Sequence, residues 1–592
     1  MTMSTGVPGR RGMGKSEPRR SLSGSVGRLR RWGLRALAIA AAGLAVAGGG
    51  IVASPTADAV ETQPRNVVMI MADDFSWDLV PYMTELKKLM ADGVSFDNHY
   101  VTNSLCCPSR ASILTGRFPH NTGVLRNGGT MGGIEAFLHG VSHSGAVRDN
   151  EQYTYAVEAQ KRGYYTLMEG KYLNGYNNDF GVGDTVRRPP GWSMWRPYSS
   201  GAYGGNSFAI GTPGQPAKKN KTYATDETIN RVAAFIPWAA KNDRAFHATL
   251  STFTTHAGNL TNAKVRSFVP AARDLPKTKE NPQGQYTNGD CGVLASGARR
   301  DCYSIRIESL PGNEGMNCPT ARDRVEIPFA KPTGKDDACE LQQYLRDRVR
   351  MAQSLDELIG KTRRELTRAG LWGSTYLVFT ADNGFHLGQG VDLGLGEDGS
   401  GAFRIGKGSP YETDLRVPLV VAGADAARGQ VRTELTQTVD LLPTFAAMQP
   451  SLTGESAQID DHDGLDLLPL IRGEQPESWR QWAYSVHTKV ADPTAAGPDS
   501  EPGTMVQDGF FALRAGGELY VQRVSGADRG TISRFSITDT KNGRVNQPLE
   551  WAELDPARRA QIEEQFRTFA RCGGGEAVGA ASCQAAARIP LS

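Results

Sequence analysis

The sequence lacks the features that mark several special classes of protein. It has no internal repeats, and after the N-terminal region no stretch is long and apolar enough to cross a bilayer. It also has little net charge, +3 at pH 7 over 592 residues, and residues 1–59 supply +7 through nine Lys/Arg and two acidic side chains. The rest of the chain therefore carries −4, which argues against a nucleic-acid binder.

The eight cysteines contain no CxxC motif and have no histidine spaced as in a zinc site, so zinc, the alternative to disulfides, has little support. Two cysteines are adjacent, and the other six fall as sequence neighbours. Spacing does not establish connectivity. In an oxidising compartment we expect each neighbouring pair to form a disulfide: Cys291–Cys302, Cys318–Cys339 and Cys572–Cys583.

The basic N-terminus predicts export. Arg30 and Arg31 precede the weakly apolar, Ala/Gly-rich residues 36–53, and Ala57-Asp58-Ala59 offers small residues for cleavage. This pattern predicts a signal peptide over residues 1–59, similar to the twin-arginine type, and hence a secreted or extracytoplasmic protein. A transmembrane anchor is the alternative. A run of three glycines at residues 48–50 opposes it, so we expect no stable membrane anchor.

Two short apolar runs predict strands at the centre of a sheet. Residues 66–72 and 375–380 are continuous runs, as expected for a parallel sheet that is buried on both faces. Apolar residues at helical spacing follow the first run up to Gly93 and precede the second over residues 341–366. The chain is long enough for one large domain and a smaller one. We therefore predict an α/β fold over residues 60–473, with a large, mostly parallel sheet flanked by helices.

Oxygen-bearing side chains follow both runs directly. Asp73 and Asp74 come after the first run, and Asp382 and Asn383 after the second. If the two strands are neighbours, these side chains meet at the carboxyl edge of the sheet, where open α/β sheets bind ligands. An all-oxygen set suits Ca²⁺ or Mg²⁺ and suits zinc poorly. The alternative is a pair of ordinary turns with solvated acids.

Residues 105–117 predict a helix start. Pro108 suits the first helical position and Gly116 the C-terminal exit. Cys106 then lies at the N-terminal end, where free amides and the helix dipole favour an anion. Arg110 lies four residues further on the same face. The arrangement suits sulfate or phosphate, whereas the alternative is a buried cysteine pair that opens an ordinary helix.

The same stretch resembles a known family. Cys106-x-Pro-Ser-Arg110, followed by Leu-Thr-Gly-Arg at residues 114–117, is similar to the signature of the sulfatases, members of the alkaline-phosphatase-like superfamily. The adjacent Cys106 and Cys107, with Phe-Pro-His-Asn at residues 118–121, resemble the N-acetylglucosamine-6-sulfatase branch. The resemblance implies hydrolysis of sulfate esters, on an aryl sulfate or on a sulfated saccharide such as the N-acetylglucosamine-6-sulfate units of glycosaminoglycans.

The resemblance also implies the cofactors and the roles of the site residues. Cys106 would be oxidised to formylglycine (3-oxoalanine) by a formylglycine-generating enzyme, and one divalent cation would bind, Ca²⁺ rather than Mg²⁺. The expected metal ligands are Asp73, Asp74, Cys106, Asp382 and Asn383. The expected catalytic residues are Cys106, Arg110, Lys171, His256 and Lys407. The expected substrate-binding residues are Lys171, His256, His386 and Lys407.

The chain departs from the family pattern at two places. Many sulfatases have a histidine two residues after the lysine that matches Lys171, and this chain has Leu173, which leaves open the base of the last step. His256 lacks the flanking prolines that are common in the family. Two alternatives therefore stay open: a phosphate or phosphonate ester hydrolase of the same superfamily, and an exported glycan-binding protein without catalysis.

Three further regions have distinct composition. Residues 258–338 lack sustained apolar periodicity and carry four cysteines, so we expect a disulfide-rich loop region rather than a separate domain. The Gly-rich residues 390–405 are a candidate lid. Residues 474–592, with short alternating strands and then a helix over 556–571, resemble the small C-terminal α+β subdomain of sulfatases.

Overall fold

The structure is a computed structural model, and it describes most of the chain after the predicted signal peptide. The described residues are 65–142, 145, 147–176, 182–259, 266–279, 281–311, 313, 318, 335–389, 405–454, 459, 461–488, 509–524, 528–540, 543–573 and 582–591. The signal peptide and all but the last residue of the candidate lid lie outside them. In these ranges, no helix has the length and apolar character that crossing a membrane requires.

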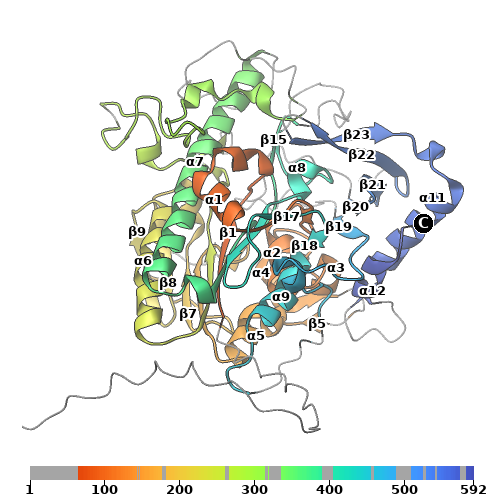
Figure 1. The fold of residues 1–592 in the computed structure, drawn as a ribbon, viewed down its shortest axis with the longest axis horizontal. Coiled ribbons are helices and arrows are strands. Elements are labelled where there is room, and N and C mark those ends of the chain that lie inside the picture. The colour runs from red at the N-terminus through yellow and green to blue at the C-terminus, as the bar shows by residue number, and fades with distance from the viewer. Residues whose placement is uncertain are drawn as a thin grey trace, which may run out of the picture. The chain divides into compact units, whose positions relative to one another are not determined.

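A sheet of eight strands lies at the centre of the described part of the chain (Figure 1). Its order is β17 (Gln430–Arg432), β2 (Gly93–Phe96), β16 (Leu419–Gly423), β13 (Thr375–Ala381), β1 (Asn66–Ala72), β10 (Phe246–Ser251), β6 (Tyr165–Gly170) and β7 (Met194–Pro197). The five strands from β13 to β7 are parallel, and only β16 runs antiparallel to its neighbours. The predicted mostly parallel sheet is confirmed.

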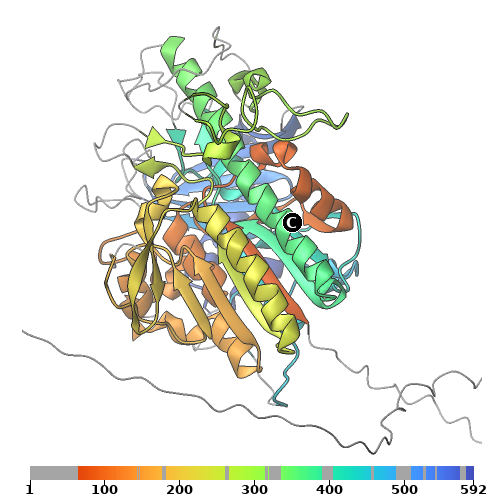
Figure 2. The ribbon, with the colours of Figure 1, turned by 90° about the vertical axis from the view of Figure 1, so that its left-hand side faces the viewer.

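Both faces of β1 are buried, because alternate side chains enter two different cores. Val68 and Ile70 pack on the face covered by α1 (Thr84–Asp92), α6 (Ala224–Lys241) and α7 (Lys335–Arg368). Val67 and Met69 pack on the face covered by α2 (Cys106–Thr115), α5 (Tyr155–Lys161) and α9 (Leu441–Met448). Figure 2 shows α6 and α7 side by side across their face of the sheet. The apolar runs of the sequence are thus central strands, as predicted.

Helix α2 begins two residues earlier than Pro108 suggests. Leu105 is the N-cap, so Cys106 is the first helical residue and Pro108 the third. The early start is possible because Asn127, from a distant loop, accepts the Cys107 amide at 2.9 Å through Oδ1. Pro108 costs nothing there, since amides of the first turn have no partner within the helix. The helix ends as predicted at Gly116, which has a φ of 66°.

A second sheet follows near the C-terminus. Its five antiparallel strands are β19 (Ala483–His487), β20 (Phe510–Ala515), β21 (Glu518–Arg523), β22 (Ile532–Thr540) and β23 (Gly543–Leu549). Helices α11 (Pro556–Phe569) and α12 (Cys583–Arg588) pack with it around Trp482, Tyr484 and Phe566. The expected small C-terminal subdomain with sheet and helices is confirmed, while its boundary at residue 474 stays a prediction.

All three predicted disulfides are present: Cys291–Cys302, Cys318–Cys339 and Cys572–Cys583. Residues 335–338 of the expected loop region already belong to α7. The described residues from 258 to the start of α7 form only 3₁₀ turns, short strands and loops, and their apolar side chains, such as Ile305, Ile307 and Leu310, join the core beside α7. The remaining elements are short: α3 (Pro119–Thr122), α4 (Gly133–His139), α8 (Glu412–Leu415), α10 (Leu468–Ile471), β3 (His99–Tyr100), β4 (Gly140–Val141), β5 (Val147–Arg148), β8 (Phe208–Thr212), β9 (Gln215–Asn220), β11 (Gly258–Asn259), β12 (Arg266–Ser267), β14 (His386–Leu387), β15 (Ile405–Gly406) and β18 (Thr436–Gln437).

Candidate active site

The carboxyl ends of neighbouring strands bring the predicted acids together. Ala72 of β1 lies opposite Ala381 of β13, so Asp73 and Asp74 emerge beside Asp382 and Asn383. The Asp74 amide donates to Asp382 Oδ1 at 3.1 Å, which joins the two strand ends directly. The predicted adjacency of these strands is therefore correct.

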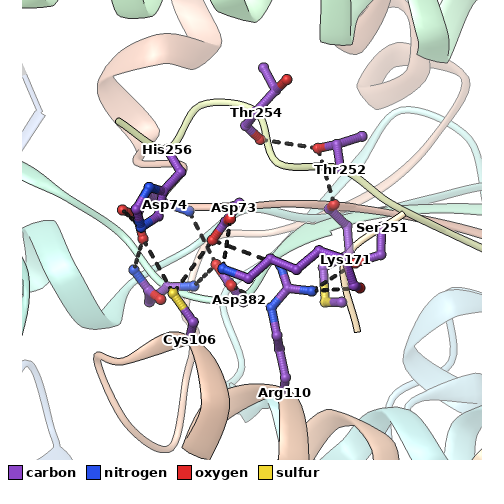
Figure 3. Close-up of polar contacts among 12 residues, drawn as sticks. Asp73, Asp74, Cys106, Arg110, Lys171, Ser251, Thr252, Thr254, His256 and Asp382 are labelled. Carbon is purple, nitrogen blue, oxygen red and sulfur yellow. Dashed lines mark hydrogen bonds and ion pairs between the residues drawn. The ribbon is translucent and has the colours of Figure 1, made fainter. Parts of the chain in front are cut away.

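The next strands along the sheet bring the candidate basic residues of the site. Strand β6 ends at Gly170 and delivers Lys171, and β10 leads into His256 (Figure 3). Lys171 Nζ lies 2.8 Å from Asp73 Oδ2, and Arg110 Nε lies 2.7 Å from Asp382 Oδ2. Lys407, just after β15, places its Nζ 2.5 Å from Asp74 Oδ1. Three cationic side chains thus meet three acids in the site.

All of these charged side chains are fully buried, and their pKa values reflect burial and mutual charge. Burial raises the pKa of Asp73 to about 6, although Lys171 opposes the shift. Burial also disfavours ionised Asp74 and Asp382, but here the opposite charges prevail and lower the pKa of each carboxyl. The lowering comes from His256 and Lys407 at Asp74, and first from Arg110 at Asp382. Buried carboxylates of this kind need positive charge close by.

Cys106 lies where the acids and the cations meet. Its Sγ is 2.8 Å from Lys407 Nζ, 3.5 Å from Asp73 Oδ1 and 3.9 Å from Asp74 Oδ1. Burial raises the pKa of this thiol well above its usual value, although Lys171 and Lys407 oppose the shift. An unmodified Cys106 is therefore protonated at neutral pH and a weak nucleophile.

His256 approaches the acids from the end of β10. Its Nδ1 donates to the Ala257 carbonyl at 2.7 Å, which directs Nε2 toward Asp74 Oδ2 at 3.4 Å. The Tyr203 ring packs against the imidazole with centroids 4.6 Å apart and lies 5.0 Å from Lys171 Nζ. The structure thus brings His256 to the same site as Cys106, in spite of the missing prolines.

The donor set fits a hard divalent cation. Ligand atoms of Asp73, Asp74, Cys106 and His256 all lie within 4.8 Å of one another. Asp74 Oδ2 and Asn383 Oδ1 are buried without a hydrogen-bond partner in the described residues, so both oxygens are available to an ion. Carboxylate and amide oxygens are the ligands that Ca²⁺ prefers. His256 is the member of this group that the sequence did not suggest as a ligand, because nothing in its local sequence indicates its approach to Asp74.

His386 lies beside the site rather than in the group around Cys106. Strand β14 pairs it with Gly406, next to Lys407, and its Nδ1 donates to Asp414 Oδ1 at 2.9 Å. Leu173, where many sulfatases have histidine, is completely buried in the core beside α2 and offers no base.

Two contacts could not be found from the sequence. Ser251 Oγ accepts a hydrogen bond from Arg110 Nη1 at 2.7 Å, and Arg348 of α7 donates to the Asp74 carbonyl at 2.9 Å. Neither residue stands in a recognisable motif. Their contacts arise only because the fold places β10 and α7 against the ends of the strands that carry the site. Both contacts hold charged residues of the site in place.

Comparisons with known proteins agree with this geometry. Residues 65–448 match the family model for sulfatases. The chain is 29% identical to the N-acetylglucosamine-6-sulfatase of Capra hircus over 452 residues, which cover 74% of this chain and 69% of the relative. A protein solved in complex with its substrate D-glucosamine-2-N,6-O-disulfate superposes with a TM-score of 0.54 at 20% identity and covers 80% of this chain and 91% of its own. A phosphonate monoester hydrolase from Silicibacter pomeroyi gives a TM-score of 0.51 at 20% identity, over 85% and 94% of the two chains. At these identities the two structures show the fold alone.

Proposed function

Because this chain belongs to the sulfatase family and is a sulfuric ester hydrolase, we propose that it desulfates saccharides through a formylglycine formed from Cys106. The observation that carries the proposal is the convergence of Arg110, Lys171 and Lys407 with the buried acids around Cys106. A sulfate group placed there meets positive charge from several directions while water is excluded, which favours charge that develops in the transition state.

These positions support the following roles for the chain's own residues. Asp73, Asp74, Asp382 and Asn383 would hold one Ca²⁺, which supplies positive charge to polarise the attacking oxygen and the sulfate. Arg110, Lys171 and Lys407 would bind the sulfate oxygens.

A formylglycine hydrate at residue 106 would supply two hydroxyls, one to attack sulfur as the bond from sulfur to the alcohol oxygen breaks, and one to expel sulfate as the aldehyde forms again. His256 or Lys407 would donate a proton to the departing alcohol. The protons that the two hydroxyls lose would return to that residue and to solvent. A plain thiol or hydroxyl has no second group to expel sulfate.

Substitutions at residues 106 and 107 test the nucleophile. Cys106→Ala should bind substrate without turnover, and Cys106→Ser should transfer sulfate once and stall. Cys107→Ala is the matched control and should keep substantial activity, because the Cys107 side chain, in the first turn of α2, is buried in the apolar core between that helix and the sheet. Loss of activity in the Cys107 variant with full activity in the Cys106 variants would refute the assignment.

The substrate we propose is a 6-sulfated glucosamine unit, since the relatives of the chain include N-acetylglucosamine-6-sulfatases. Parallel assays with matched sulfate, phosphate and phosphonate esters of one alcohol test the reaction class. Sulfate hydrolysis should exceed the other two, and a faster phosphonate reaction would contradict the proposal. Maturation would require a formylglycine-generating enzyme, and residues 1–59 would direct export by the twin-arginine route.

A further inference from the structure

Two side chains on the rim of the site have unsatisfied polar atoms. His487, at the end of β19, is 3% exposed, and its Nδ1 is buried with no hydrogen-bond partner among the described residues. Arg126 is half-buried, its Nε has no partner there either, and no described carboxylate forms an ion pair with it. Buried polar atoms are normally satisfied, so two such atoms close together point to a ligand.

A chain of contacts places both residues near the N-terminal end of α2, the end at which Cys106 stands. Asn127, next to Arg126, accepts the amide of Cys107. Asn103 accepts the amide of Leu105, the N-cap of α2, through Oδ1. Its Nδ2 donates at 2.6 Å to the carbonyl of Val486, the residue before His487. Thr488 Oγ1 donates to the Leu125 carbonyl at 3.2 Å. The loop that carries Arg126 and the end of β19 therefore lie together against the N-terminal end of α2.

The local charge favours an anion. Besides burial, the positive charge of Arg126 lowers the pKa of His487 to about 4, so the imidazole is neutral and can donate one hydrogen bond. The acid whose charge opposes this shift at His487 is Asp414, and the oxygens of Asp414 already accept from His386 and from the Ser409 amide. Arg126 is thus a guanidinium without a counter-charge in the described part of the chain, and its planar donors match a sulfate or carboxylate group.

Resting on the proposed function, we infer that Arg126 and His487 form a subsite for a second anionic group of the saccharide whose sulfate ester is cleaved. The second anionic group belongs to the part of the saccharide that leaves as the alcohol. It lies at Arg126 and His487 when the sulfate to be cleaved lies at Cys106. The structure therefore assigns the enzyme a preference for dianionic saccharides over monosulfated ones. The second anion is either an N-sulfate on the same ring or a carboxylate on the adjoining sugar.

The test compares kcat/KM for three substrates: N-acetylglucosamine-6-sulfate, glucosamine-2-N,6-O-disulfate, and N-acetylglucosamine-6-sulfate linked to glucuronic acid. The wild-type enzyme should prefer at least one dianionic substrate by about tenfold or more, as expected for a charge-assisted contact. Arg126→Gln should reduce this preference about tenfold, Arg126→Lys should retain part of it, and His487→Gln should reduce it less. Arg428→Gln, which replaces an exposed arginine paired with Asp92, is the control and should leave the preference unchanged.

The outcomes separate the two proposals. The substrate whose preference falls in Arg126→Gln identifies the source of the anion. An unchanged preference in that variant, measured on protein with wild-type thermal stability, would overturn the subsite, and so would equal kcat/KM for all three substrates in the wild type. Failure to hydrolyse any sulfate ester, 4-nitrophenyl sulfate included, would instead overturn the proposed function.

Discussion

The site has two halves that the fold supplies in different ways. The acidic half, Asp73, Asp74, Asp382 and Asn383, stands directly at the ends of two adjacent strands. The basic half, Arg110, Lys171 and Lys407, arrives from a helix and two loops. The acids are fixed by sheet register, whereas the cations reach them through long side chains. In the structure Lys171 pairs with Asp73 and Lys407 with Asp74, while Arg110 pairs with Asp382 and, at 3.8 Å, with Asp73. The two halves thus neutralise each other.

This difference implies that the acidic half binds the metal and the basic half binds the sulfate group. A divalent cation would take over the neutralisation of the acids and leave the lysines available to a sulfate group. Changes in the acidic half should therefore abolish metal binding, while changes in the basic half should weaken catalysis and leave the metal in place.

The largest effect is expected for Asp382→Asn. The substitution removes a ligand charge and the nearest acid to Arg110, so that a buried guanidinium keeps only its longer ion pair with Asp73, at 3.8 Å. We expect kcat/KM to fall by about 10³-fold or more and bound calcium, measured by atomic absorption after gel filtration, to be lost.

Asp463→Asn is the matched control, because Asp463 is also fully buried but accepts the Phe118 amide away from the site. It should keep calcium whatever its thermal stability. Full calcium content in Asp382→Asn would contradict the assignment of the acidic half.

A smaller effect is expected for Lys171→Met in the basic half. Loss of one cation near the sulfate should lower kcat/KM by about 10²-fold. Calcium should remain bound, while the metal-free protein should lose thermal stability because Asp73 loses its nearest counter-charge. Lys161→Met, at an exposed lysine paired with Glu158, is the control. If Lys171→Met released calcium, the two halves would not be separable as we describe.

The smallest effect concerns pH. The pKa of Asp73 in the metal-free protein, about 6, lies above that of an unfolded aspartate, about 4. Between these values the folded state binds the extra proton, so raising the pH destabilises the metal-free protein. Below pH 6 calcium must displace that proton from Asp73. The affinity for calcium should therefore fall about tenfold for each unit by which the pH is lowered in this range.

Asp463 also has a pKa of about 6, so the stability of the metal-free protein alone is not diagnostic. The difference in melting temperature with and without calcium isolates Asp73. It should be largest above pH 7 and shrink toward pH 5, and a constant difference would be inconsistent with the raised pKa of Asp73.

The sequence predicted the acidic half better than its surroundings. The run at residues 66–72 and the acids after it sufficed, because a buried strand and the position of its end are local properties. The start of α2 was misplaced since the sequence does not show that Asn127, 20 residues further along the chain, accepts the Cys107 amide. Ser251 and the rim residue His487 were missed for the same reason: their contacts depend on which segments the fold brings together.

We propose above all that residue 106 of the active enzyme is formylglycine. Mass spectrometry of the peptide that spans residues 106 and 107, taken from enzyme of known specific activity, tests it most directly. We predict a peptide lighter by the difference between CH₂SH and CHO, located at residue 106 by fragmentation and reactive toward a hydrazide, in proportion to activity. A fully active enzyme with an unmodified thiol at Cys106, or with the modification at Cys107, would contradict it.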